Sequence, residues 1–260
     1  MLSININPAE LAVFLSILLR LSIVLFMLPF FNTTELPSVV KALTVVALSA
    51  MLFPFIKRSI QPMPLELASI ISVIIGELIY GIFFTVSMQA IFCAFQLAGE
   101  LIGFEMGFGF AQAADPQSGA RFSVVAVYAQ MVATLIFFSI NGHHVVLKIL
   151  VESFKVLPVG SFTVDSRVFS KMLFISGTMF VLAMKLAAPV LAVLMLTQIG
   201  LGLMSKFAPQ VNILATGFPL TITVGFLFFG MTLVYWGGVG TESFNRLFHF
   251  LGNLTNSFKF

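Results

Sequence analysis

Four charged side chains inside apolar stretches of this 260-residue sequence are the residues best placed to do chemistry: Arg20, Glu77, Glu100 and Lys185. A charge at membrane depth is costly, so such residues usually face a bundle interior or an aqueous path and pair with another group. Arg20 and Glu100 lie near the ends of their stretches and can reach the interface. Glu77 and Lys185 cannot do so as easily. A transporter would use these charges for a solute or protons, whereas a structural subunit would use them as buried charge pairs, and structural pairing is the expected role.

Other patterns for catalysis or metal binding are weak. Ser38 and Lys41 match Ser-x-x-Lys, but the companion motifs are absent and Ser is a natural helix N-cap. His143 and His144 are adjacent, so on a helix they point about 100° apart and do not form an i, i+4 ligand pair. Cys93 stands alone in an apolar run, which is typical of a small buried side chain. The sequence therefore predicts a protein that is not an enzyme and has no cofactor or metal site.

The composition predicts a membrane protein. Hydrophobic residues make up 59% of the chain and charged residues 9%, against about 25% charged residues in a soluble domain. A soluble fold of this length cannot hide so much apolar surface. The 13 Lys and Arg residues are dispersed along the chain, with Lys57-Arg58 as an adjacent pair. This dispersal argues against a nucleic-acid partner, since phosphate binding needs clustered basic residues.

Apolar runs of about 18 residues or more are long enough to cross a membrane as helices. Such runs recur along the chain and predict an all-α membrane protein with about six apolar regions. These regions are 9–31, 38–56, 66–100, 122–147, 171–205 and 211–240.

Three of these regions are too long for one plain span. A straight helix over 66–100 would extend about 50 Å, well beyond the ~30 Å of hydrocarbon. Such helices either tilt steeply and protrude or break into kinked hairpins. Pro189 and Pro219 mark the expected breaks. Because a break at membrane depth needs cover from protein or a water cavity, this pattern favours a subunit packed inside a larger assembly.

Glycines mark the end of the third region. Gly99, Gly103 and Gly107 recur every fourth residue, a spacing that lets helix backbones approach closely in membranes. The helix is expected to end around 107–110. Asp115-Pro116 then disfavours helix, because the residue before a proline is pushed away from αR.

Bulky apolar side chains occur where this helix gives way to a loop. An ordinary solvated connection would not normally carry Phe104, Met106, Phe108 and Phe110. The loop is therefore predicted to lie buried in protein.

The run from Gln96 to Phe110 (QLAGELIGFEMGFGF), followed by residues 115–119 (DPQSG), resembles the signature of the export-gate family of flagellar FliR and its counterparts in virulence-type type III secretion systems. The resemblance covers essentially the whole chain. It implies one membrane domain over 1–260, with a FliP-like part over about 1–205 and a FliQ-like hairpin and tail over about 206–260. It also implies kinked helices largely above the bilayer plane, which would override a six-span topology.

The resemblance further implies partners and a location. Several copies of FliP and FliQ would pack with this chain into a helical hetero-oligomer that joins FlhB and FlhA. The expected location is the bacterial inner membrane, within the flagellar basal body. Unfolded flagellar proteins would pass through the channel, and membrane lipid would surround it. The choice of flagellum over injectisome rests on the resemblance alone.

The loop over 106–121 corresponds to the plug that closes the pore of this family. An apolar loop can seal a pore sterically and by dewetting, and glycines give the freedom to swing aside. The alternative function is a secondary transporter using Glu77 and Lys185, but the inverted repeats typical of transporters are not evident. The plug residues implied by the resemblance are Met106, Gly107, Phe108, Gly109, Phe110, Asp115, Pro116 and Gly119.

Overall fold

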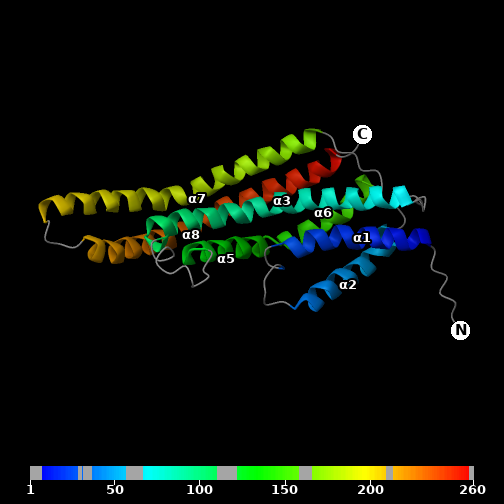
Figure 1. The fold of residues 1–260 in the computed structure, drawn as a ribbon, viewed down its shortest axis with the longest axis horizontal. Helices are drawn as coiled ribbons and strands as arrows, with labels where there is room; N and C mark the ends of the chain where they lie inside the picture. Colours follow the sequence, from blue (N-terminus) through cyan, green and yellow to red (C-terminus); the bar gives the residue numbers. More distant parts are fainter. Residues whose placement is uncertain are drawn as a thin grey trace. The chain divides into compact units, whose positions relative to one another are not determined.

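The computed structural model describes residues 8–28, 31, 37–56, 67–109, 122–157, 166–208 and 213–257. Helices make up the regular secondary structure of these segments (Figure 1), which confirms the all-α class predicted from the sequence. The helices are α1 (Pro8–Met27), α2 (Ser38–Ile56), α3 (Leu67–Glu105), α5 (Val124–Ser139), α6 (Gly142–Val156), α7 (Ser166–Phe207) and α8 (Ile213–Ser257).

The helices are long and apolar enough to identify the chain as a membrane protein. Within the described residues, α2, α3, α7 and α8 each have a stretch suited to crossing a membrane, and the bent pair of α5 and α6 can supply a fifth. The region expected as one helix over 122–147 is in fact this pair. Asn141 lies between the two helices in the left-handed conformation, with φ 55°, which Asn tolerates better than most residues.

The breaks expected at Pro189 and Pro219 are wrong, because α7 continues through Pro189 and α8 through Pro219. Membrane helices tolerate proline when neighbouring groups satisfy the freed backbone. Unbroken, the 42 residues of α7 and 45 residues of α8 extend about 63 and 68 Å at 1.5 Å per residue. Both are much longer than the hydrocarbon layer, so as continuous helices they must tilt or protrude if they cross a membrane.

The chain forms two compact units, each with its own core. Unit 1 comprises Met1–Ala90, Asn141–Ser176 and Asn245–Phe260, and unit 2 comprises Ile91–Ile140 and Gly177–Phe244.

In unit 1, α1 packs against α2 and against the first part of α3. Phe14 on α1 meets Phe53 on α2 edge-on, with ring centroids 6.0 Å apart. Gly81 on α3 provides room for α1, because a Cβ atom there would lie 2.7 Å from Cγ2 of Ile23.

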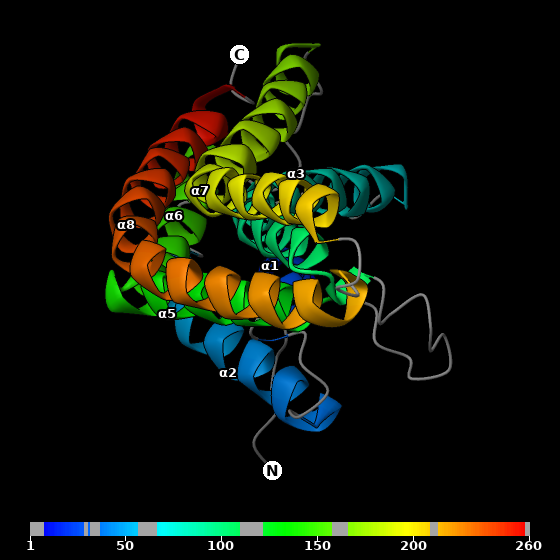
Figure 2. The ribbon, with the colours of Figure 1, turned by 90° about the vertical axis from the view of Figure 1, so that its left-hand side faces the viewer.

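Aromatic rings form much of the core of unit 2, where α5 runs alongside α8 (Figure 2). Phe92 on α3, Phe137 on α5 and Phe244 on α8 meet with ring centroids 5.3–5.6 Å apart. Trp236 on α8 is fully buried and meets Phe95 edge-on. Its indole Nε1 donates a hydrogen bond of 3.1 Å to the carbonyl of Leu186 on α7. Several of the many Phe residues of this sequence are therefore buried against other parts of the protein. Cys93, which was expected to be buried, is exposed.

Gly99 and Gly103 bring α3 close to the start of α5. A Cβ atom on Gly99 would lie 2.6 Å from Cα of Ala126, and one on Gly103 would lie 2.5 Å from Oγ of Ser123. Real Cβ atoms do not approach other atoms so closely. The small residues therefore act as the sequence spacing predicts, by allowing two backbones to touch.

We expect Gly99→Ala to destabilise the protein by about 1–3 kcal/mol, because the added methyl group would meet backbone that cannot rotate away. Gly177→Ala on α7 is the matched control, since nothing lies within 4 Å of a Cβ atom at that position. Both changes improve helix propensity equally, by up to about 1 kcal/mol. Unfolding in mixed detergent micelles measures the difference. Equal stability of the two variants would mean that the close approach of α3 and α5 is not needed.

Candidate functional site

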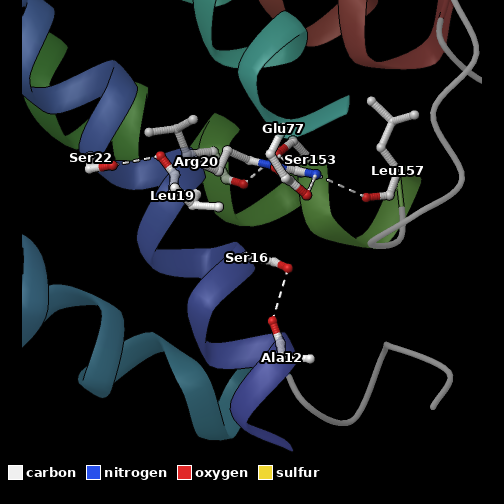
Figure 3. A network of polar contacts seen from close by, with 9 residues as sticks. Ala12, Ser16, Leu19, Arg20, Ser22, Glu77, Ser153 and Leu157 are labelled. Atoms are coloured by element: carbon white, nitrogen blue, oxygen red, sulfur yellow. Dashed lines mark hydrogen bonds and ion pairs between the residues drawn. The ribbon is translucent and has the colours of Figure 1, made fainter. Parts of the chain in front are cut away.

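An ion pair enclosed within unit 1 joins α1 to α3 (Figure 3). Arg20 on α1 donates two hydrogen bonds to the carboxylate of Glu77 on α3, from Nε to Oε2 at 2.5 Å and from Nη2 to Oε1 at 2.8 Å. Each side chain is at most 4% exposed. This two-pronged geometry is the strong form of a guanidinium–carboxylate pair. Arg20 is therefore buried. It does not extend toward a membrane interface, although its position near the end of an apolar stretch would have allowed that.

The end of α6 completes the surroundings of the guanidinium. Arg20 Nη1 donates to Oγ of Ser153 at 2.9 Å, and Nη2 donates to the carbonyl of Leu157 at 3.4 Å. Its Cζ atom lies over the rings of Phe154 and Tyr80, 4.0 and 4.7 Å from their centroids, distances at which a cation is attracted by the ring faces. One arginine thus ties α1, α3 and α6 together.

This network is suited to holding helices in place rather than to moving a solute or a proton. Both carboxylate oxygens of Glu77 accept hydrogen bonds from Arg20, and the carboxylate is enclosed. Glu77 therefore does not offer a free oxygen to a transported solute in this arrangement.

Glu100 has a different role, at the start of α5. Its Oε2 accepts hydrogen bonds from the backbone N–H of Ser123 at 2.9 Å and from Oγ of Ser123 at 2.7 Å. Ser123 is the N-cap of α5, and its Oγ accepts from the N–H of Ala126 at 3.2 Å. Glu100 thereby fixes the capping residue, and capping typically contributes about 1 kcal/mol to helix stability.

Lys185 lies apart from the other charges, exposed on α7. Among the described residues it forms no hydrogen bond or ion pair. The pairing of Lys185 with an acid therefore stays a prediction. Of the four charged residues singled out from the sequence, the structure pairs Arg20 with Glu77 and Glu100 with Ser123.

The described start of the expected plug loop is anchored on α8. Met106 follows the end of α3 and is fully buried. Thr221 donates a hydrogen bond of 3.2 Å from Oγ1 to the Met106 carbonyl. A Cβ atom on Gly225 would lie 2.6 Å from Cγ of Met106, so this glycine provides the space that the Met106 side chain fills.

Gly107 turns the chain at this anchor. Its φ of +97° strongly favours glycine, and a Cβ atom there would lie 2.6 Å from Cδ1 of Phe218 on α8. Phe108, the next residue, meets Phe226 edge-on with ring centroids 6.2 Å apart. Gly107 thus faces α8, whereas Gly99 and Gly103 face α5, because α3 ends at Glu105 before the glycine spacing does.

The remaining expected plug residues lie outside the described residues. These are Phe110, Asp115, Pro116 and Gly119. Gly109 is described and lies close to the ring of Phe104.

Several residues that form these sites were not identified by the sequence patterns. Ser123 had a readable signal, since Ser directly before an apolar run is a typical helix N-cap. Ser153, Thr221 and Gly225 had no such signal, because Ser, Thr and Gly are common within apolar membrane helices. Their roles depend on which helix lies opposite.

Potential metal ligands do not gather within the described part of the chain, where no group of three or more His, Cys, Asp or Glu side chains is placed to hold an ion. His143 and His144 lie in the first turn of α6, with ring centroids 4.1 Å apart.

The fold and these contacts define a class of protein: an all-α membrane protein in which a buried ion pair, Arg20 with Glu77, joins helices of the same chain. Comparison with known proteins specifies the family. The chain belongs to the bacterial export proteins, family 1, whose model matches residues 11–247.

Individual relatives match most of the chain. The flagellar biosynthetic protein FliR of Pectobacterium carotovorum subsp. carotovorum is 31% identical over 231 residues, covering 87% of this chain and 86% of that protein. FliR of Escherichia coli (strain K12) is 32% identical over 180 residues, which are 69% of each chain. FliR of Bacillus subtilis (strain 168) is 29% identical over 228 residues, covering 86% of this chain and 85% of that protein.

Proposed function

We propose that this chain is a subunit of the flagellar protein export gate and forms part of the channel through which unfolded flagellar proteins are secreted. The observation that carries this proposal is the similarity, along most of the chain, to proteins named flagellar biosynthetic protein FliR. The family description as export proteins agrees with it. The chain would act without catalysis or a cofactor, in the bacterial inner membrane within the flagellar basal body.

The exposed apolar surface supports a role inside a larger assembly. In the most apolar stretches of α7 and α8, only 28% and 22% of residues are buried by the chain itself. Helices about 63 and 68 Å long cannot be covered by a ~30 Å layer of hydrocarbon alone. Other subunits must cover what lipid does not, and the proposed partners are FliP and FliQ in several copies, with FlhB and FlhA.

The internal division of the chain is also a proposal. The FliP-like part would cover about 1–205, and the FliQ-like hairpin and tail would follow. The described part of that second section contains the end of α7 and the single helix α8, so a hairpin there would be built from α8 together with α7.

We also propose that the loop over 106–121 is the plug of the channel. The anchoring of Met106 on α8 supports a loop that starts from a fixed point. Gly107, with φ +97°, is then the natural hinge, because glycine passes most easily between backbone conformations. In this proposal Met106 holds the base of the plug, and the residues after Gly107 move.

The proposed partnership predicts that co-expression with FliP and FliQ homologues yields one stable complex. A tag on this chain should recover both partners through detergent exchange and size-exclusion chromatography. A tagged α-helical transporter of similar size, expressed with the same partners, is the control for nonspecific association. Recovery of this chain as a well-behaved monomer, with neither partner bound, would contradict the proposal.

A further inference from the structure

We propose that the face of α7 centred on Lys185 docks against a helix of another subunit, and that this helix carries an Asp or Glu carboxylate that pairs with Lys185. The inference rests on the proposed export-gate function and specifies one of its interfaces. It is carried by the surroundings of Lys185 on the exposed side of α7.

The charge of Lys185 stands in a long apolar surface. Large apolar side chains are exposed along α7 on both sides of it, from Phe169 to Leu203. That distance is about 51 Å along the helix, so a ~30 Å hydrocarbon layer that α7 crosses without steep tilt does not cover both halves. At least one half adjoining Lys185 therefore needs cover from protein, and Lys185 lies where the two halves meet.

The backbone adds a second polar group at the same position. Pro189 lies four residues after Lys185 within α7 and has no N–H. The carbonyl of Lys185 therefore lacks its usual i+4 donor. The side-chain ammonium has no partner among the described residues either. Polar groups in apolar surroundings need partners, so this place on α7 calls for an acceptor from outside the chain and can also take a donor.

The shape of this face suits a helix. The exposed residues one and two turns from Lys185 on the same side of α7 include Thr178, Val181, Pro189 and Ala192. They are smaller than Phe174 and Leu196, which lie further out on that side and are also exposed. Small side chains allow the backbones of membrane helices to approach closely. A helix seated here would bring its carboxylate to the ammonium and a hydroxyl or amide donor to the carbonyl.

The carboxylate is expected from a different protein rather than from the long helix α3 of a second copy. The described acids of the long helix α3 are already engaged: Glu77 with Arg20, Glu100 with Ser123, and Glu105 with Gln198 at 3.2 Å. Pairing between α3 of a second copy and Lys185 would break one of these contacts.

The test is assembly of Lys185→Met with co-expressed FliP and FliQ homologues. Removing one partner of an interfacial charge pair leaves the other unpaired, so we expect the yield of intact complex to fall at least about tenfold. Lys206→Met is the matched control, since Lys206 is exposed in the last turn of the same helix and can reach the interface. Its yield should equal that of the wild type. Lys185→Arg should retain most of the complex, because it keeps the charge.

Two further measurements locate the partner and guard against misfolding. The amount of Lys185→Met in membranes without partners should match the wild type, because the change removes a costly charge. A photocrosslinking residue at Val181 or Ala192 in the complex should label a partner helix near an acidic residue. Neutralising that acid in the Lys185→Met background should restore assembly.

The possible outcomes separate the two proposals. If the complex forms equally well with Lys185→Met and Lys206→Met, the inference is wrong and the export-gate function stands. Crosslinks only to lipid or to a second copy, or labelling of a cysteine at Val181 by a water-soluble maleimide in the complex, would likewise overturn it. If the wild type forms no complex at all, the proposed function fails and this interface fails with it.

Discussion

Replacing Arg20 by methionine is expected to lower the free energy of unfolding by about 3–5 kcal/mol, the range found when one partner of a buried ion pair is removed. The change leaves the Glu77 carboxylate enclosed without the two hydrogen bonds that it accepts from Arg20. It also removes the links from Arg20 to Ser153 and Leu157 at the end of α6. Equilibrium unfolding in mixed detergent micelles measures the loss, and accumulation in membranes provides a second readout.

A double variant distinguishes the ion pair from simple packing. Arg20→Met combined with Glu77→Leu removes both charges, and apolar replacement of a whole buried pair is often neutral or stabilising. We therefore expect the double variant to recover most of the lost stability. Lys148→Met on the exposed side of α6 is the control and should remain close to the wild type. If Arg20→Met were as stable as Lys148→Met, the network would not be holding α1, α3 and α6 together.

Deleting residues 110–118 is expected to make the assembled channel leak ions and small solutes while leaving assembly largely intact. An apolar constriction blocks ions by dewetting, and each ~1.4 kcal/mol of barrier removed raises the flux about tenfold. We therefore expect at least a tenfold rise in the conductance of the complex in planar bilayers. The deletion retains Met106, which contacts α8, so the anchor of the loop should survive.

A variant of unchanged length supports the same test. Phe108→Ser combined with Phe110→Ser keeps the loop but removes apolar rings proposed to seal the pore, and it should also leak. Phe104→Ser is the control, because Phe104 is an exposed ring on α3 before the turn. Assembled complexes that carry either loop change and conduct no more than the wild type would rule out the plug.

Much of the fold could be predicted from apolar run length. The expected region 38–56 coincides with α2, and the other long helices were found with ends displaced by a few residues or more. Proline was misread, because its effect depends on whether the surroundings satisfy the backbone that it frees. The break at Asn141 was also missed, although the Asn-Gly dipeptide at 141–142 is a typical turn signal.

The candidate sites were predicted in part. Arg20 and Glu77 were each recognised as costly charges that need a partner, but the sequence did not show that they pair with each other, 57 residues apart along the chain. The end of α3 was expected around 107–110 and is at Glu105. The glycine spacing indicated close packing but not that Gly107 faces a different helix from Gly99 and Gly103.

By itself, the sequence determined that this protein is helical and embedded in a membrane, because composition and run length fix the solvent that its side chains require. It also carried the pattern by which its export family can be recognised. Only the tertiary structure decided which charges meet, which glycines admit a neighbouring backbone, and where the loop after α3 is held. These outcomes depend on the rotation and depth of each helix relative to its neighbours, which local periodicity does not specify when apolar residues occur on every face.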